Sequence, residues 1–124
     1  MRRVLIVDDE PMILEVAQVS LETIAGWTVL TAGDGAEAVR VAAVQQPDAI
    51  LMDVMMPGMD GPATCRHLAE NAETSTIPII LLTAKVQRAD QRQWESLPVA
   101  GVLGKPFDPV ALPSQMADLL GWTL

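Results

Sequence analysis

The chain has 124 residues, of which 16 are acidic and 8 basic, giving a formal net charge of −8. That length fits one domain of ordinary size, and a surface this acidic repels nucleic-acid phosphates and anionic lipid, so we expect direct binding to neither. The single cysteine, Cys65, excludes an internal disulfide, and no apolar run approaches the ~20 residues that span a bilayer. These bounds predict a soluble, cytoplasmic protein.

The first half of the sequence alternates short apolar runs with helical patterns. Residues 4–7 are continuously apolar, which is typical of a strand buried on both faces, and residues 11–25 follow with a helical period. Residues 27–32 are rich in β-prone side chains, and a second helical pattern covers residues 36–46. Another apolar run occupies residues 49–52. We therefore expect the order strand, helix, strand, helix, strand in this half.

The second half continues the alternation. We expect a third helix over about residues 62–72, a fourth strand over 77–82, a more polar helix over 86–97 and a fifth strand over 99–103. A last helix follows them. Because a proline inside a helix cannot donate the backbone hydrogen bond, Pro113 predicts that this helix begins late or bends.

Five strands alternating with five helices predict an α/β fold, in which a doubly wound parallel sheet carries helices on both faces. The sequence has no linker or internal repeat, so residues 1–124 are expected to form one domain. If the strands lie in the order 2-1-3-4-5, the first and third are neighbours. A crevice then opens at their carboxyl ends, which is where ligand chemistry takes place in such sheets.

Reactive side chains follow four of the expected strands. Asp8 and Asp9 follow the first strand, Asp53 the third, Thr83 the fourth and Lys105 the fifth. Because the carboxyl ends of parallel strands meet at one edge, we expect these side chains to converge there. Each has an ordinary explanation on its own, as a turn former, a helix cap or a loop residue. All five at one edge favour a shared function.

The convergence of three carboxylates indicates a cation site. Carboxylates at close range stay ionised only beside a compensating positive charge. An all-oxygen site with few protein ligands suits Mg²⁺ better than Ca²⁺. Asp53 is then the candidate nucleophile, because a carboxylate can accept a phosphoryl group as an acyl phosphate. The Lys105 ammonium would neutralise charge on the phosphoryl oxygens, and Thr83 offers a hydroxyl donor.

Four stretches of the sequence resemble the response-regulator receiver family, and the resemblance covers essentially the whole chain. They are VLIVDDE at residues 4–10, DAILMDVMMPGMDG at 48–61, PIILLTA at 78–84 and GKPF at 104–107. The resemblance implies a flavodoxin-like (βα)5 fold with a five-stranded parallel sheet of order 2-1-3-4-5. It also implies a signalling protein that is not an enzyme, beyond catalysing its own phosphorylation and slow dephosphorylation.

The resemblance assigns roles to the site residues. Asp53 is the phospho-acceptor in that family pattern, and Mg²⁺ is held by Asp9, Asp53 and the backbone carbonyl of Met55, with Asp8 acting mostly through water. Lys105 is expected to contact the phosphoryl group.

The resemblance also implies a conformational switch, and here the sequence departs from the family. Thr83 is expected to swing toward the phosphoryl group, and the bond between Lys105 and Pro106 is expected to be cis, which an X–Pro bond tolerates at modest cost. The family usually has Tyr or Phe three residues before the lysine, whereas this chain has Val102. A valine has no ring to reorient, so the family's threonine–aromatic relay is in doubt.

The partners follow from the same resemblance. A sensor histidine kinase or a histidine phosphotransfer protein is expected to supply the phosphoryl group, and no attached output domain is expected, so the signal passes to another protein. Trp94 and Trp122 are candidate contact residues, with partial core packing as the alternative, and His67 is expected at the surface.

Three alternatives remain. The first is a receiver-like scaffold that is never phosphorylated and only binds a partner. The second is a haloacid-dehalogenase-like phosphatase, which also uses an aspartyl nucleophile and Mg²⁺; that class spaces its two key aspartates two apart after the first strand, whereas Asp8 and Asp9 are adjacent. The third is a nucleotide- or flavin-binding protein, which would need a glycine-rich loop after the first strand in place of these acids.

Overall fold

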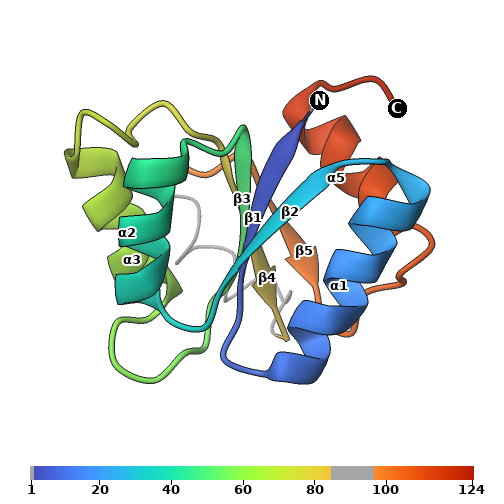
Figure 1. Ribbon diagram of the computed structural model, residues 1–124. Helices are drawn as coiled ribbons and strands as arrows, with labels where there is room; N and C mark the ends of the chain where they lie inside the picture. The colour runs from blue at the N-terminus through green and yellow to red at the C-terminus, as the bar shows by residue number, and fades with distance from the viewer. Residues whose placement is uncertain (1, 85–96) are drawn as a thin grey trace.

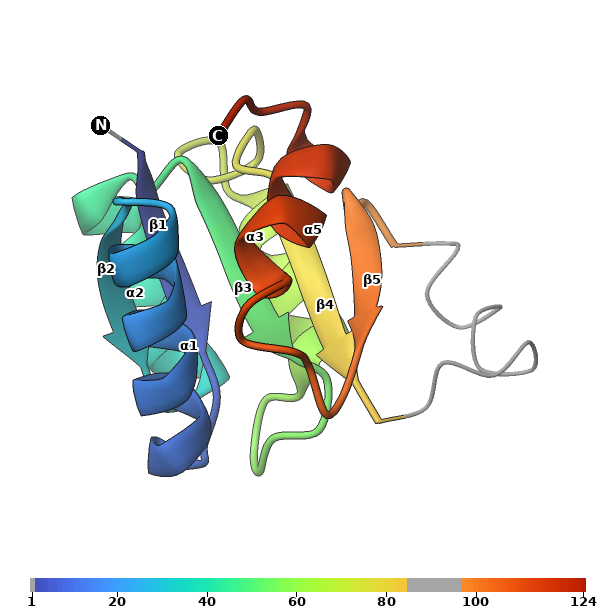
Figure 2. The ribbon, with the colours of Figure 1, turned by 90° about the vertical axis from the view of Figure 1, so that its right-hand side faces the viewer.

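Five parallel strands form one sheet at the centre of the protein (Figure 1). The computed structural model describes residues 2–84 and 97–124. The strands lie in the order β2-β1-β3-β4-β5, which can be followed from left to right in Figure 2 and confirms the expected flavodoxin-like topology. The strand bounds are β1 Arg3–Val7, β2 Thr28–Ala32, β3 Ala49–Asp53, β4 Ile79–Thr83 and β5 Gly101–Gly104.

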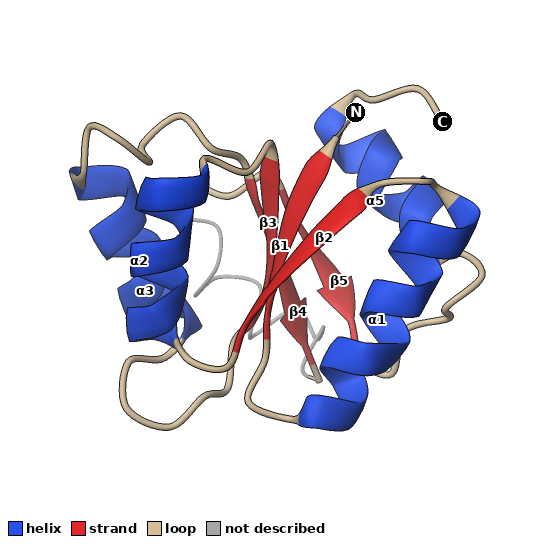
Figure 3. Cartoon of the chain, in the orientation of Figure 1, coloured by secondary structure: helices blue, strands red, loops and turns tan. Residues whose placement is uncertain are grey.

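Helices cover both faces of the sheet (Figure 3), with α1 and α5 on one side and α2 and α3 on the other. Within the described ranges the helices are α1 Pro11–Ile24, α2 Gly35–Gln45, α3 Gly61–Glu70 and α5 Leu112–Leu120. The helix expected over residues 86–97 falls almost entirely outside those ranges. None of the described helices combines the length and the apolar character needed to cross a membrane.

Local side-chain chemistry sets where three helices begin. The Asp34 carboxylate accepts a hydrogen bond from the Glu37 N–H at 2.7 Å and caps α2. Asp60 caps α3 in the same way, through the Ala63 N–H at 2.8 Å. Each cap satisfies a backbone donor that has no partner inside its helix. Pro113 lies in the first turn of α5, where no N–H is needed, so the predicted late start of this helix is confirmed.

Strands β4 and β5 begin two residues later than the sequence predicted. Before β4, the Ile77 N–H bonds the Thr74 carbonyl at 3.1 Å in a turn, and Pro78 has no N–H to donate to a neighbouring strand. Before β5, the Val99 N–H bonds the Leu97 carbonyl at 2.8 Å. Hydrogen bonds to nearby residues therefore replace sheet pairing at both positions. The other described elements for which bounds were predicted begin and end within two residues of those bounds.

The central strands β1 and β3 are buried on both faces, as continuous apolar runs predict. Side chains such as Leu5 and Ile50 pack toward α2 and α3, whereas Ile6 and Leu51 pack toward α1 and α5. Each fully buried side chain of this size contributes about 1.5–3 kcal/mol relative to an exposed one. The two-sided core therefore holds the carboxyl ends of β1 and β3 in fixed positions, and the site is built there.

Residues near the two ends of the chain meet at the amino-terminal ends of β1 and β2, away from the carboxyl ends of the strands. The rings of Trp27 and Trp122 lie edge to face with centroids 5.2 Å apart, and the Arg2 guanidinium lies 4.2 Å from the centre of the Trp122 ring. Trp122 is half-buried against the cluster between the sheet and α1 and α5, so the core-packing interpretation of this residue is confirmed.

We expect Trp122→Ala to lower the free energy of unfolding by about 2 kcal/mol, because it removes a half-buried ring and its aromatic contact. Urea denaturation followed by circular dichroism measures the change. Arg2→Ala is the matched control, since it removes only the cation–π contact and should cost about 0.5–1 kcal/mol. If Trp122→Ala and Arg2→Ala lowered the free energy of unfolding equally, burial of the Trp122 ring would contribute no more than the cation–π contact, which would contradict this prediction.

The Cys65 thiol lies buried in the core, where burial raises its pKa from 9.0 to about 12. The reactive form is the thiolate, so at pH 8 ionisation alone should slow its reaction with Ellman's reagent roughly 1,000-fold relative to the unfolded chain. Because the raised pKa favours the protonated thiol, its contribution to stability is complete below pH 9 and is lost as the pH rises toward 12. Rapid labelling of the folded protein at pH 8 would contradict this prediction, and labelling in urea provides the reference rate.

Candidate functional site

The predicted site residues come together at the carboxyl edge of the sheet. Asp8 directly follows β1, Asp53 and Thr83 are the last residues of β3 and β4, and Lys105 directly follows β5. The strand registers bring these ends level, since Asp53 pairs with Leu82 and Thr83 pairs with Gly104. The position that each residue occupies along its strand therefore places it at the same edge.

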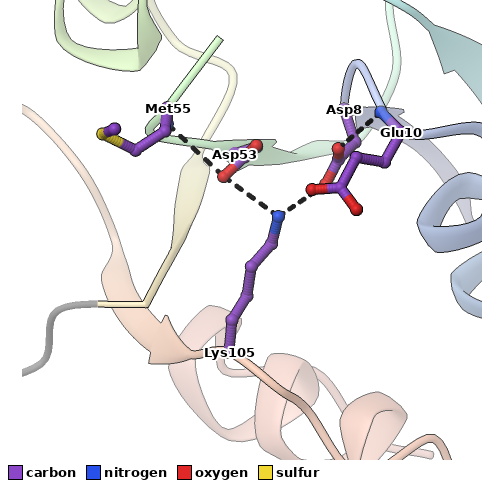
Figure 4. Close-up of polar contacts among 5 residues, drawn as sticks. All are labelled: Asp8, Glu10, Asp53, Met55 and Lys105. Carbon is purple, nitrogen blue, oxygen red and sulfur yellow. Dashed lines mark hydrogen bonds and ion pairs between the residues drawn. The ribbon is translucent and has the colours of Figure 1, made fainter.

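Lys105 bridges two buried carboxylates (Figure 4). Its Nζ lies 2.9 Å from Asp8 Oδ2 and 3.2 Å from Asp53 Oδ1. Asp8 is 0% exposed and Asp53 is 4% exposed, so water screens these ion pairs only weakly. One ammonium thus lies between two carboxylates that come from neighbouring strands.

Backbone groups fix the orientation of both carboxylates. The Glu10 N–H donates to Asp8 Oδ1 at 2.9 Å, and the Met55 N–H donates to Asp53 Oδ1 at 3.4 Å. The Met55 backbone therefore lies beside Asp53, while its side chain is largely exposed. Charge-assisted bonds of this kind stabilise the ionised form of a carboxylate.

Lys105 directly follows β5 and reaches the carboxylates at the ends of β1 and β3 from that strand. The Lys105 N–H donates to the Thr83 carbonyl at 2.8 Å, which extends the pairing of β4 and β5 by one residue. The Lys105–Pro106 bond is cis, as the family resemblance implied. Thr83 is buried and ends β4, at the same edge of the sheet as the carboxylates.

Opposing influences act on the ionisation of the site. Burial and the charge of Asp8 raise the pKa of Asp53 above its ordinary 3.8, against the opposite effects of Lys105 and the Met55 N–H. Burial alone would lower the pKa of Lys105, but its bonds to Asp8 and Asp53 outweigh burial and raise that pKa above 10.5. A buried carboxylate whose charge is costly is the kind of group that gains from a further cation.

The donor atoms of the site fit a hard divalent cation. Asp8, Asp9 and Glu10 each place a carboxylate oxygen within 4.8 Å of the others, and Asp53 faces Asp8 across the Lys105 ammonium. Oxygen donors with open access on the exposed Asp9 side suit Mg²⁺, which retains several waters. Glu10 was not among the predicted site residues, although its position directly after the two aspartates could have indicated it.

The other residues singled out from the sequence lie away from this contact network. Val102 is half-buried in β5, pairs with Leu81 and packs against the cluster under α2 and α3. His67 is exposed near the end of α3, which confirms the prediction of a surface residue. Trp94 lies outside the described residues.

Comparison with known sequences identifies related proteins. The chain is 39% identical over 112 residues to the protein PilH of Pseudomonas aeruginosa, a match that covers 90% of this chain and 92% of PilH. It is 37% identical over 120 residues to the transcriptional regulator RpaA of Synechocystis, covering 97% of this chain and 49% of RpaA. With the response regulator PleD of Caulobacter vibrioides, 39% identity over 122 residues covers 98% of this chain and 27% of PleD. The chain thus spans about half of RpaA, about a quarter of PleD and most of PilH.

Solved structures share the fold over almost the whole chain. The chemotaxis protein CheY4 of Vibrio cholerae superposes with a TM-score of 0.89 at 31% identity, covering 96% of this chain and 98% of that one. The receiver domain of the sensor histidine kinase PA1611 of Pseudomonas aeruginosa, described with a magnesium ion coordinated in its active-site cleft, gives 0.86 at 32% identity, covering 97% and 98%.

The sequence pattern described as the response regulator receiver domain matches residues 4–117, which include every residue of the site. With the parallel sheet, the acidic edge and the relatives above, this match shows that the chain belongs to the response regulator receiver domain family.

Proposed function

We propose that this chain is a phosphorylation-dependent switch in which Asp53 accepts a phosphoryl group from a histidine kinase or a histidine phosphotransfer protein. The observation that carries the proposal is the Asp53 carboxylate itself, which is buried, oriented by the Met55 N–H and in contact with Lys105. A carboxylate held beside a cation at the open edge of a parallel sheet is positioned for an incoming phosphoryl group.

Each residue has one part in the proposed reaction. An Asp53 oxygen attacks phosphorus as the P–N bond of the donor phosphohistidine breaks, which gives an acyl phosphate on Asp53. The Lys105 ammonium moves onto a phosphoryl oxygen, and the Thr83 hydroxyl donates to another. The carboxylates of Asp8 and Asp9 and the backbone carbonyl of Met55 are proposed to hold Mg²⁺ with Asp53. The metal would neutralise charge on the phosphoryl oxygens during transfer.

The relatives support the metal and the signalling role. A magnesium ion is named in the cleft of the PA1611 receiver domain, which is 32% identical to this chain, and the present site offers oxygen donors that suit the same ion. PleD is named a response regulator, and CheY4 is named a chemotaxis protein and response regulator. The proposed output is a change in binding to a separate protein, whose identity depends on surface residues rather than on the site.

The energy of the proposed switch is within reach of these contacts. Moving a two-state balance from 1:99 to 99:1 requires about 5.5 kcal/mol of differential interaction. Bonds from Lys105 and Thr83 to a charged phosphoryl group, at roughly 1.5–3 kcal/mol each, sum to about 3–6 kcal/mol, which reaches that amount near its upper end. Since position 102 is a valine, the movement of Thr83 must be transmitted without a reorienting aromatic ring.

Intact-mass analysis after incubation with a small-molecule phosphodonor tests the proposal. We expect the native chain to gain one phosphoryl group in Mg²⁺ and none in EDTA. No metal-dependent gain would favour the alternative of a receiver-like scaffold that only binds a partner. Continuous release of phosphate from a small phosphate ester would instead favour the phosphatase alternative, since a switch has no such turnover.

A further inference from the structure

The segment that joins β5 to α5, residues 105–111, borders open space along much of its length. Its exposed residues include Pro106, Asp108, Pro109 and Val110. Two hollows of about 370 Å³ each lie between this segment and α1, and Val16 of that helix lines both of them. The first borders residues 105–107 and the second borders residues 109–110. Close packing against α1 therefore contributes little to holding the segment in place.

A buried hydroxyl joins this segment to α1 beside the second hollow. Ser20 is 4% exposed, and its hydroxyl donates a hydrogen bond to the Pro109 carbonyl. The other buried residues of α1 are Ala17 and Leu21, both apolar, so Ser20 is the polar member of the buried face of this helix. A serine inside a helix usually bonds its own helix or solvent, whereas this bond reaches a residue 89 positions away. The contact therefore fixes Pro109 to a helix on which it is otherwise poorly packed.

The chain between Pro109 and Lys105 is stiff. Proline rings fix the backbone φ angle at Pro106 and again at Pro109. Between them, the Asp108 carboxylate accepts a hydrogen bond from the Val110 N–H at 2.9 Å, in the turn that leads toward α5. A displacement of Pro109 is consequently passed along few rotatable bonds to the residue that follows β5.

We propose that Ser20 is a positioning residue for Lys105, which acts through Pro109 and keeps the lysine side chain directed at Asp53. This inference rests on the proposed function, in which the lysine contacts the phosphoryl group. The Lys105 N–H is held by the Thr83 carbonyl at 2.8 Å, so release of Pro109 would turn the lysine side chain about that point. Transfer depends steeply on such alignment, because a misplacement of about 1 Å can slow a reaction about 100-fold.

Phosphoryl uptake from acetyl phosphate in Mg²⁺, followed by intact mass, tests this role with Ser20→Ala. We expect an initial rate about fivefold to tenfold lower than that of the native chain, because the variant loses the hydrogen bond that holds Pro109. Ser20→Thr keeps a hydroxyl donor, and the hollow beside Ser20 has room for the added methyl group. Its uptake rate should therefore stay within about twofold of the native rate.

Thr74→Val is the matched control for loss of a buried hydroxyl. Thr74 is 1% exposed, and its hydroxyl donates to the Leu68 carbonyl at 2.7 Å. It precedes β4, whereas the site lies at the carboxyl ends of the strands. We expect Ser20→Ala and Thr74→Val to raise the equilibrium constant for unfolding by a similar factor, about fivefold, in urea denaturation. Uptake by folded Thr74→Val should stay within about twofold of the native rate.

The position of Lys105 can also be measured without phosphorylation. The sequence contains two lysines, Lys85 and Lys105, so a protein labelled with carbon-13 lysine gives a simple NMR spectrum, in which Lys85→Arg identifies the Lys105 signal. In EDTA, we expect Ser20→Ala to move the Lys105 side-chain signal toward its position in the urea-unfolded chain. Ser20→Thr and Thr74→Val should leave that signal at its native position.

The outcomes separate this inference from the proposed function. Slower uptake and a moved Lys105 signal in Ser20→Ala, both restored in Ser20→Thr, support the positioning role. Native uptake in Ser20→Ala, equal slowing in Thr74→Val, or no rescue by Ser20→Thr overturns it. Slower uptake with an unmoved Lys105 signal also overturns it, because the effect would then bypass the lysine. If the native chain takes up no phosphoryl group, the proposed function fails, and the Lys105 signal alone decides whether Ser20 positions the lysine.

Discussion

Asp53→Asn is expected to abolish metal-dependent phosphoryl uptake. Asparagine keeps the shape of the side chain, and its amide oxygen can still accept from the Met55 N–H, so the backbone around the site should be retained. The neutral amide has no anionic oxygen to attack phosphorus, and it removes one charged ligand from the proposed cation site. The measurement is the intact mass of the protein after incubation with a phosphodonor in Mg²⁺.

The matched control for this variant is Asp60→Asn. Asp60 is exposed at the start of α3 and accepts from the Ala63 N–H, a role that asparagine performs equally well. We expect Asp60→Asn to take up a phosphoryl group to the native extent. Uptake by Asp53→Asn that still requires Mg²⁺ would place the acceptor at another residue, and loss of uptake in both variants would show that the amide effect is not specific to Asp53.

The fold and the position of the site could be predicted because they depend on short-range patterns. Continuous apolar runs are the mark of strands buried on both faces, and β1 and β3 form where those runs occur. The polar residue that ends or follows each run then lies at the carboxyl end of its strand, and this position does not depend on how the core side chains pack. Asp8, Asp53 and Lys105 therefore lie together at that edge, as the sequence pattern predicts.

The contacts within the site could not be predicted in the same way. The bridge from Lys105 to both carboxylates depends on the path of the segment after β5, including its cis bond, and its contact with Asp8 links residues 97 positions apart. The position of Glu10 directly after two aspartates could have indicated it, but the close approach of its carboxylate to theirs depends on the turn that begins α1. The late starts of β4 and β5 likewise depend on local turns that compete with sheet pairing for the same backbone groups.

Gly61 packs directly against the backbone of Asp53 and Val54. Gly61→Ala is therefore expected to lower the free energy of unfolding by about 3 kcal/mol. A methyl group on Gly61 would lie 2.8 Å from the Asp53 carbonyl oxygen and 2.8 Å from Val54 Cα. Both atoms belong to the backbone, and the Gly61 N–H also donates to the Val54 carbonyl at 3.0 Å, so the chain cannot relieve the contact by a side-chain rotation. Urea denaturation in EDTA measures this loss.

Gly33→Ala provides the control for adding the methyl group. The nearest atom to a methyl at Gly33 is a carboxylate oxygen of Glu37 at 3.8 Å, an ordinary contact, so stability should stay within about 0.5 kcal/mol of the native value. Because the crowded atoms at Gly61 include the backbone of Asp53, we also expect Gly61→Ala to slow phosphoryl uptake under conditions in which the variant remains folded. Native stability and native uptake in Gly61→Ala would mean that the segment between β3 and α3 adjusts freely. Asp53 would then owe its position to the Met55 and Lys105 contacts alone.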